Sequence, residues 1–274
     1  MKKFELSTFV EIKGIGATSG LVHVNNLLFI VSDNSTFLYQ YTISENWLFK
    51  IKLFDNSQES MAKKDKADFE VLTLFENKLY LFGSGSTKNR NRRVAYCIEN
   101  KSLKEKDLTK IYKKLTNKIS IDACELNIEG VIITPEITYF FQRGNSINAP
   151  NGIFCYERTT KNVVFNLITL PKINEIEATF TDAILIEETI YFLAAAENTN
   201  SAYDDGEIMG SFIGTINLTT LKLIDCIQIS DKIKFEGFAL YKKATNKIEL
   251  LLCEDDDKEQ LVSTIYLLKL FLEK

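Results

Sequence analysis

The sequence predicts an all-β protein, a five-bladed β-propeller, and two observations lead to this prediction. A polar residue with a side-chain oxygen, followed by a short β-prone run, recurs five times at intervals of about 55 residues. Each copy continues through a turn, an aromatic-rich strand, a polar loop and a third alternating strand. Such units leave no room for helical layers, and radial repetition of small antiparallel sheets is the propeller architecture. Because no linker or low-complexity tract interrupts the series, residues 1–274 are predicted to form a single domain.

The five units follow one another along the whole chain. Their first strands are expected at 18–22, 69–73, 128–132, 181–185 and 235–239, their second strands at 27–31, 78–82, 137–141, 189–193 and 248–252, and their third strands at 37–43, 94–98, 152–157, 211–218 and 264–270. Fourth strands fit at 47–54, 162–170 and 221–229. The last unit has no residues left for a fourth strand, so the strand-like run 3–12 at the N-terminus is expected to close it and protect its edge.

One segment departs from the repeat. Near residues 103–117, Leu108, Ile111, Tyr112 and Leu115 recur at helical spacing between lysines and glutamates. This spacing predicts one short amphipathic helix, which either replaces or follows the outer strand of the second unit.

Composition and charge limit the partners. The 33 Lys and Arg residues against 37 Asp and Glu residues give a net charge of −4, so no overall basic field draws the protein to nucleic acid or to a membrane. The single histidine, His23, excludes multi-histidine zinc sites and is interpreted as a packed core imidazole. Five cysteines without a C-x-x-C spacing, together with a glutamate where a signal peptide would be apolar, predict buried reduced thiols and a cytoplasmic location.

The repeated polar positions predict a metal site on the propeller axis. The first strand of each blade lines the central channel, so five side chains are expected to converge there: Ser19, Glu70, Glu129, Asp182 and Glu236. Carboxylates that converge in a narrow channel must be protonated, paired with cations or neutralised by a metal. A donor set made only of oxygens favours Ca²⁺, with Mg²⁺ second. The alternatives are that backbone amides bind these acids or that Arg90, Arg92 and Arg143 fold inward as counter-charges.

The loop 83–93 predicts an anion-binding segment on the same face. It combines flexible backbone amides, hydroxyls and cations, and its candidate substrate-binding residues are Ser84, Ser86, Lys88, Arg90 and Arg92. An ordinary solvated hairpin loop is the alternative. Arg143, on the loop of the third unit, supplies another cation, whereas the loops of the fourth and fifth units are acidic around Glu197, 204–207 and 254–257.

The axial residues also carry a family resemblance. Ser, Glu, Glu, an equivalent of Ser, and Glu on the five inner strands resemble the calcium-activated nucleotidases, or soluble apyrases, and residues 19–22, 27–32 and 234–237 look like better-kept stretches of that family. The resemblance implies calcium in the central tunnel, held by Glu70, Glu129 and Glu236 with oxygens from Ser19 and Asp182. Lactonase and phytase-like calcium propellers are similar more distantly, and the chain also resembles an uncharacterised family of bacterial propellers. The nucleotidases carry two aspartates and Arg-Thr-Gly where this chain has Ser-Asp-Asn-Ser-Thr at 32–36, so only Asp33 is retained.

These observations predict a calcium-binding hydrolase of a small anionic substrate, either a phosphoester or anhydride or a sugar-acid lactone. A metal-activated water, with Asp33 or a ring carboxylate as base and Arg90 or Arg143 holding the anion, is the hydrolytic arrangement that the residues permit. The alternative is a non-catalytic propeller with a structural ion, whose polar face binds a protein or a glycan.

Overall fold

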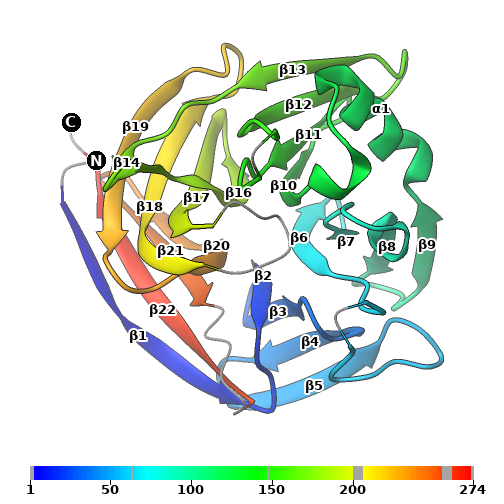
Figure 1. Ribbon diagram of the computed structural model, residues 1–274. Helices are drawn as coiled ribbons and strands as arrows, with labels where there is room; N and C mark the ends of the chain where they lie inside the picture. The colour runs from blue at the N-terminus through cyan, green and yellow to red at the C-terminus, as the bar shows by residue number, and fades with distance from the viewer. Residues whose placement is uncertain (1–2, 63, 147, 200–205, 255–260, 273–274) are drawn as a thin grey trace.

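The computed structural model describes residues 3–62, 64–146, 148–199, 206–254 and 261–272, and it confirms the five-bladed β-propeller (Figure 1). Each blade is a four-stranded antiparallel sheet. The first consists of β2 (Thr18–Val24), β3 (Leu27–Ser32), β4 (Phe37–Thr42) and β5 (Trp47–Lys52), and the second of β6 (Phe69–Phe75), β7 (Lys78–Gly83), β8 (Arg92–Cys97) and β9 (Leu103–Asp107). The third consists of β10 (Ile128–Ile133), β11 (Ile137–Gln142), β12 (Gly152–Glu157) and β13 (Val163–Leu167).

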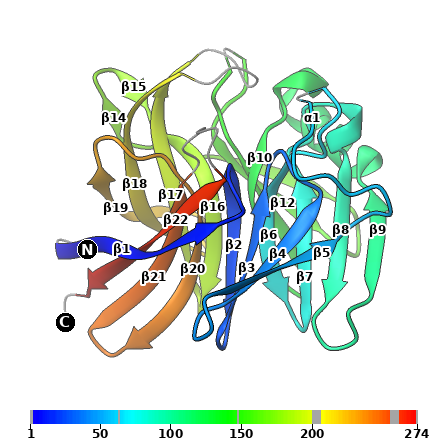
Figure 2. The same cartoon turned by 90° about the horizontal axis from the view of Figure 1, so that it is seen from below.

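The fourth and fifth blades complete the ring. The fourth consists of β16 (Thr179–Ile186), β17 (Thr189–Asn198), β18 (Glu207–Asn217) and β19 (Leu223–Ser230), preceded by the short pair β14 (Lys172–Ile173) and β15 (Ile176–Glu177). The fifth consists of β20 (Phe235–Ala244), β21 (Lys247–Glu254), β22 (Val262–Phe271) and β1 (Lys3–Lys13). Strand β1 pairs antiparallel with β22, from Lys3 opposite Phe271 to Lys13 opposite Val262, so the N-terminal strand closes the last blade as predicted (Figure 2).

The core lies between neighbouring blades, because each sheet packs face to face against the sheets on either side of it around the ring. Phe141 on β11, for example, packs edge-on against Phe180 on β16, and Phe180 packs in the same way against Phe192 on β17, with ring centroids 5.2 Å apart in both pairs. All three rings are fully buried. The aromatic-rich second strands of the repeat therefore supply the contacts that join one blade to the next.

The helix differs from its predicted limits. Residues 103–107 form β9, because this segment pairs with β8 as the outer strand of the second blade. The helix α1 (Thr109–Ile119) follows that strand at the outer rim between the second and third blades (Figure 1). Its buried side chains are Tyr112, Leu115 and Thr116, and the Tyr112 hydroxyl donates a 2.7 Å hydrogen bond to the carbonyl of Gly83. The helix thereby fixes the start of the polar loop 83–93.

Two further features bear on the sequence predictions. None of the five cysteines forms a disulfide, but only Cys253 is buried, and Cys124 is exposed. In the described part of the chain, no helix is both long enough and apolar enough to cross a membrane.

Candidate functional site

A β-bulge at the start of every inner strand sets the positions of the axial residues. The pairing of each first strand with its second strand skips one residue, and the skipped residue is the same one in all five blades: Ser19, Glu70, Glu129, Thr181 and Glu236. A bulge leaves its extra residue outside the ladder and bends the strand, so it can turn a side chain toward the channel. The five-fold pattern inferred from the sequence is therefore a repeated backbone irregularity.

The fourth blade corrects the predicted register by one residue. Thr181, not Asp182, occupies the position equivalent to Ser19, and both hydroxyls donate a 2.6 Å hydrogen bond to the carbonyl of the first residue of the next blade's inner strand, Phe69 for Ser19 and Phe235 for Thr181. The structure thus places two hydroxyls and three glutamates at the repeated position. The recurrence of acids in the other blades favoured Asp182, because this acid lies directly next to Thr181, the residue that occupies the bulge.

Asp182 fills a place that three other blades leave to glycine. The residue after the bulge is Gly20, Gly130 or Gly237 in those blades, and a Cβ there would meet backbone of the next blade at 2.8–2.9 Å. In the fourth blade the Asp182 carboxylate accepts the amide of Ala183 at 2.7 Å and that of Phe238 in the next blade at 3.0 Å. Asp182 therefore bridges two blades through backbone amides, which was the alternative weighed for the axial acids.

The first half of the axial site combines three carboxylates with two cations. Oxygen atoms of Asp33, Asp68 and Glu70 all lie within 4.8 Å of one another. The Lys66 ammonium pairs with Asp33 and, at 2.9 Å, with Asp68, while Arg90 reaches Asp68 at 2.7 Å. No hydrogen bond or ion pair of Glu70 is found among the described residues, so one carboxylate of this half has no counter-charge of its own.

The candidate anion-binding loop divides between this site and the surface. Ser84 donates to Asp68 and lies 3.3 Å from Ser86, which accepts from Arg90 at 2.8 Å. These three residues are buried. Lys88 is exposed, and Arg92 faces outward, where it pairs with Glu105 at 3.3 Å and lies over the Phe54 ring. Of the five loop residues predicted to bind substrate, the structure brings together Ser84, Ser86 and Arg90 and keeps Lys88 and Arg92 apart from them.

The second half of the axial site also combines three carboxylates with two cations. Arg143 bridges the blades, with one terminal nitrogen 3.2 Å from Glu129 and the other bonded to Glu197. Lys234 similarly reaches Glu236 at 2.7 Å and Glu197 at 3.5 Å. All five side chains are at least nine-tenths buried. The Oε2 atom of Glu236 is buried without a hydrogen-bond partner among the described residues.

The acids of the axial site differ in the direction of their pKa shifts. Burial dominates for Glu70 and Glu129, whereas neighbouring cations together outweigh burial for Glu197. Burial, and then the charges of Asp68 and Glu129, raise the pKa of Glu70 well above its ordinary value. Burial raises the pKa of Glu129 to about 7, although Arg143 opposes the shift. For Glu197 the balance is reversed, because Arg143 and Lys234 outweigh burial and hold its pKa below the ordinary value. Perturbed acids gathered in one place are typical of functional sites.

Sequence reasoning missed residues that complete the site. Three of them lie two positions before a bulged glutamate: Asp68 before Glu70, Asn127 before Glu129, and Lys234 before Glu236. Alternate residues of a strand project to the same side, so this spacing was the available signal. Asn127 donates a 2.7 Å hydrogen bond to Glu129, as expected for a neighbour on that side. Lys66 and Glu197 carry no comparable signal in the repeat. Residues 204–205 and 255–257 of the acidic loops lie outside the described residues.

The two halves together make up the axial site, which comprises Asp33, Lys66, Asp68, Glu70, Arg90, Glu129, Arg143, Asp182, Glu197, Lys234 and Glu236. Among these described residues, seven carboxylates face four cations. The site can therefore accept further positive charge.

Comparisons with known proteins agree with the fold. A family model described as a family of unknown function, DUF6929, matches residues 14–270. No curated protein matches the sequence. Among solved structures, a luciferin-regenerating enzyme superposes with a TM-score of 0.51 at 10% identity, over 97% of this chain and 95% of that chain. An identity this low shows a shared propeller fold alone. These matches support the resemblance to an uncharacterised family, and neither of them names an apyrase or a phytase-like protein.

Proposed function

We propose, for a chain that belongs to the DUF6929 family of unknown function, that the axial site binds a divalent cation of the calcium type and serves the hydrolysis of a small anionic substrate. The observation that carries the proposal is the convergence of Asp33, Asp68 and Glu70, whose oxygens lie within 4.8 Å of one another. Calcium binds oxygen at about 2.4 Å, so two ligands on opposite sides of one ion lie about 4.8 Å apart. The three oxygens are therefore close enough to share a single ion.

Charge supports the same assignment. Lys66 and Arg90 offset two of the three carboxylates in this half of the site, and Glu70 is the acid that they leave uncompensated. A buried carboxylate surrounded by like charges is costly in its ionised form, and a bound cation would reverse that cost. The unpartnered Oε2 of Glu236 is a further oxygen in the same channel that such an ion, or its bound water, would satisfy. Magnesium fits less well because it requires stricter octahedral geometry.

Glu129 is the residue best suited to move a proton. Its pKa of about 7 gives both protonation states near neutral pH, which is what general acid–base catalysis requires. Arg143 and Asn127 hold its carboxylate in place through Oε1. A bound divalent ion would supply a Lewis acid and a more acidic water. Because Arg143 is buried between two glutamates, its role in this proposal is to position Glu129. Arg90, which also pairs with Asp68, is the cation on the loop 83–93 that we propose to face the substrate anion.

The substrate classes remain those predicted from the sequence, a phosphoester or anhydride, as in the nucleotidases that the inner strands resemble, or a sugar-acid lactone. A cytoplasmic location is part of the proposal, on the ground that none of the five cysteines forms a disulfide. The second candidate, a non-catalytic propeller that binds a protein or glycan, is favoured by the ion pairs of Arg143 and Lys234, because every carboxylate in that half of the axial site already has a cationic partner without an ion.

A calorimetric titration of the metal-free protein with CaCl₂ and then with MgCl₂ tests the ion site. We expect calcium to bind the unmodified protein, magnesium to bind more weakly, and the variant Glu70→Gln to lose about tenfold or more in calcium affinity, since one charged ligand is worth about 1.5–3 kcal/mol. Glu249→Gln is the matched control, because Glu249 is also a largely buried glutamate on a blade strand but pairs with Lys247 rather than with residues of the axial site. Absence of both heat and a melting shift in the unmodified protein overturns the ion site.

A turnover assay tests the hydrolase. The protein is incubated with p-nitrophenyl phosphate, a nucleoside diphosphate and a sugar-acid lactone, with calcium or with a chelator. We expect calcium-dependent turnover of one class that falls by about a hundredfold or more in Glu129→Gln, in keeping with loss of general acid–base catalysis. Calcium binding without turnover of any class would leave the ion in a structural role and favour the binding module.

A further inference from the structure

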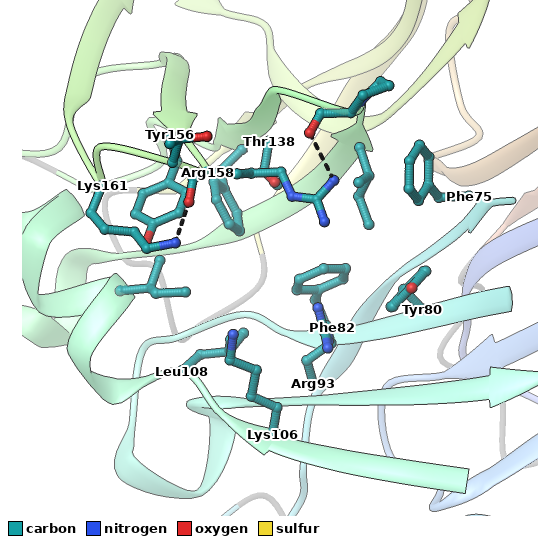
Figure 3. Close-up of a pocket in the computed structure, with 15 residues that line it drawn as sticks. Phe75, Tyr80, Phe82, Arg93, Lys106, Leu108, Thr138, Tyr156, Arg158 and Lys161 are labelled. Atoms are coloured by element: carbon teal, nitrogen blue, oxygen red, sulfur yellow. Dashed lines mark hydrogen bonds between the residues drawn. The ribbon is translucent and has the colours of Figure 1, made fainter. Parts of the chain in front are cut away.

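A second concave site lies between the second and third blades, away from the axial site. It is a cavity of about 370 Å³ lined by both blades and by the first turn of α1 (Figure 3). Phe75 and Pro135, which line it, lie at the ends of β6 and β10 opposite to those that carry Glu70 and Glu129. We call this cavity the interblade pocket. Its volume is within the range of small-molecule sites.

Four cations surround the interblade pocket, and none of the described residues that line it is acidic. These cations are Arg93 on β8, Lys106 on β9, and Arg158 and Lys161 on the loop after β12. Among the described residues, none of the four forms an ion pair or a hydrogen bond with a carboxylate. Arg158 donates only to the carbonyls of Thr134 and Pro135, and Lys161 to the carbonyl of Arg158. The positive charge of the pocket is thus uncompensated.

This arrangement is unusual in a protein whose net charge is −4. Like charges that converge on one cavity repel one another, and the repulsion is greater where water is partly excluded. Lys106 shows the consequence, because burial and then the charges of Arg93, Lys161 and Arg158 lower its pKa. The Nε atom of Arg93 is buried and has no hydrogen-bond partner in the part of the chain that the structure describes. A bound anion would relieve both features.

Aromatic rings form the remaining walls. The Arg93 guanidinium lies over Tyr80, 4.8 Å from the ring centroid, and Arg158 lies 5.6 Å from that of Phe75. Phe82, Phe140 and Tyr156 complete the apolar lining, with Phe140 edge-on to both of the others. Contact with the rings holds the two guanidinium groups in place without a carboxylate partner and leaves N–H donors for a ligand. The pocket therefore offers cations for an anionic group and rings for an apolar or aromatic body.

A neighbouring cavity of about 600 Å³ extends the site along the outer strands of the second blade. It shares Tyr80, Arg93 and Lys106 with the interblade pocket and adds Lys78 and Lys104, together with Glu105, which pairs with Arg92. A ligand larger than the pocket can therefore continue along a lysine-rich groove.

From the cations without carboxylate partners, the aromatic walls and the volume of the cavity, we infer that the interblade pocket binds a small aromatic phosphate. The phosphate is held by Arg93, Lys106 and Arg158, and the ring packs on the aromatic walls. Charge-assisted hydrogen bonds to phosphate are the strongest contacts available to these side chains. The inference does not depend on the proposed axial hydrolase, because no residue is shared between the two sites.

The test is a calorimetric titration of the full chain with phenyl phosphate, with inorganic phosphate and phenol as half-ligands. We expect phenyl phosphate to bind more tightly than either half, and Lys106→Gln to weaken it about tenfold, since one charge-assisted contact is lost. The side chain of Lys106 is exposed and makes no hydrogen bond with the described residues, so this variant should fold normally. Lys110→Gln, an exposed lysine of α1 that does not line the pocket, is the matched control and should bind as the unmodified protein does.

Three outcomes overturn the inference. Phenyl phosphate does not bind, or it binds no better than inorganic phosphate, or Lys106→Gln and Arg158→Gln both bind it with unchanged affinity. The variant Glu70→Gln separates the two sites, because binding at the interblade pocket should survive this change. Loss of phenyl phosphate binding in Glu70→Gln would assign the ligand to the axial site instead.

Discussion

The axial site and the interblade pocket gather charge in opposite ways. In the axial site every cation has a carboxylate partner, and the excess charge is negative. In the interblade pocket four cations share no carboxylate among the described residues, and the excess is positive. Both sites use the second and third blades. Strands β6 and β10 carry residues of the axial site at their N-terminal ends and residues of the interblade pocket at their C-terminal ends.

The difference separates charges that hold the fold from charges that await a ligand. A buried ion pair of good geometry is a poor indicator of a ligand, because its partners already satisfy one another. Charges that burial and like neighbours disfavour are better indicators, because the bare protein gives them no compensation. By this criterion we propose Glu70 and Lys106 as ligand-binding positions and Arg143 as a residue that holds the fold.

Removing Arg143 should have the largest effect on stability. The change Arg143→Met leaves Glu129 and Glu197 buried without their shared cation, and breaking a buried pair from one side costs about 3–5 kcal/mol. Urea unfolding followed by circular dichroism measures the loss. Arg92→Met is the matched control, because Arg92 pairs with Glu105 at the surface, where such pairs contribute about 0–1 kcal/mol. Equal losses in the two variants would show that the axial pairs do not hold the blades together.

The next largest effect on stability should come from the raised pKa of Glu129, through the dependence of stability on pH. Burial raises the pKa of Glu129 from 4.5 to about 7, so between these values the folded state binds a proton that the unfolded state has released. Stability should therefore fall as the pH rises from 4.5 to 7, and the contribution of Glu129 should be constant above that. The fall amounts to about 1.4 kcal/mol for each pKa unit, or about 3 kcal/mol in all.

The variant Glu129→Gln isolates this contribution, because a neutral side chain cannot titrate. In the presence of a chelator, the difference in unfolding free energy between the two proteins should change by a few kcal/mol between pH 4.5 and 7 and then level off. A constant difference across this range would mean that Glu129 keeps an ordinary pKa in the folded protein. Glu249→Gln, measured in parallel, controls for removal of a buried carboxylate as such.

The fold could be predicted from the sequence because it repeats. Five copies of one pattern average out local ambiguity, and the spacing of the copies leaves space for only one architecture. The N-terminal closure followed from the same count, since the last unit lacked a strand. The helix limits were less well predicted because residues 103–107 are exposed, highly charged and bear no alternation, so only their pairing with β8 defines them as a strand.

The axial site could be predicted only where it follows the repeat. Glu70, Glu129 and Glu236 were found because they recur, and Asp182 was placed one position off because Thr181 gives a weaker signal than an acid. Lys66 and Glu197 come from segments that differ from blade to blade, and only the folded chain brings them to the axis. The interblade pocket had little sequence signal. Arg93 belongs to the loop 83–93, which was predicted to bind an anion on another face, and Lys106, Arg158 and Lys161 look like ordinary surface charge.

The smallest predicted effect tests whether the cations of the interblade pocket truly lack compensation. If they do, Lys106→Gln should stabilise the ligand-free protein slightly, by about 0.5 kcal/mol at low salt, because one of several repelling charges is removed at an exposed position. The gain should shrink when 0.5 M NaCl screens the repulsion, over a Debye length of about 4 Å. Urea unfolding at both salt concentrations measures it, with Lys110→Gln as the control. A loss of stability at low salt would mean that Lys106 has a favourable partner, and the contrast with the axial site would then rest on Arg93 and Arg158 alone.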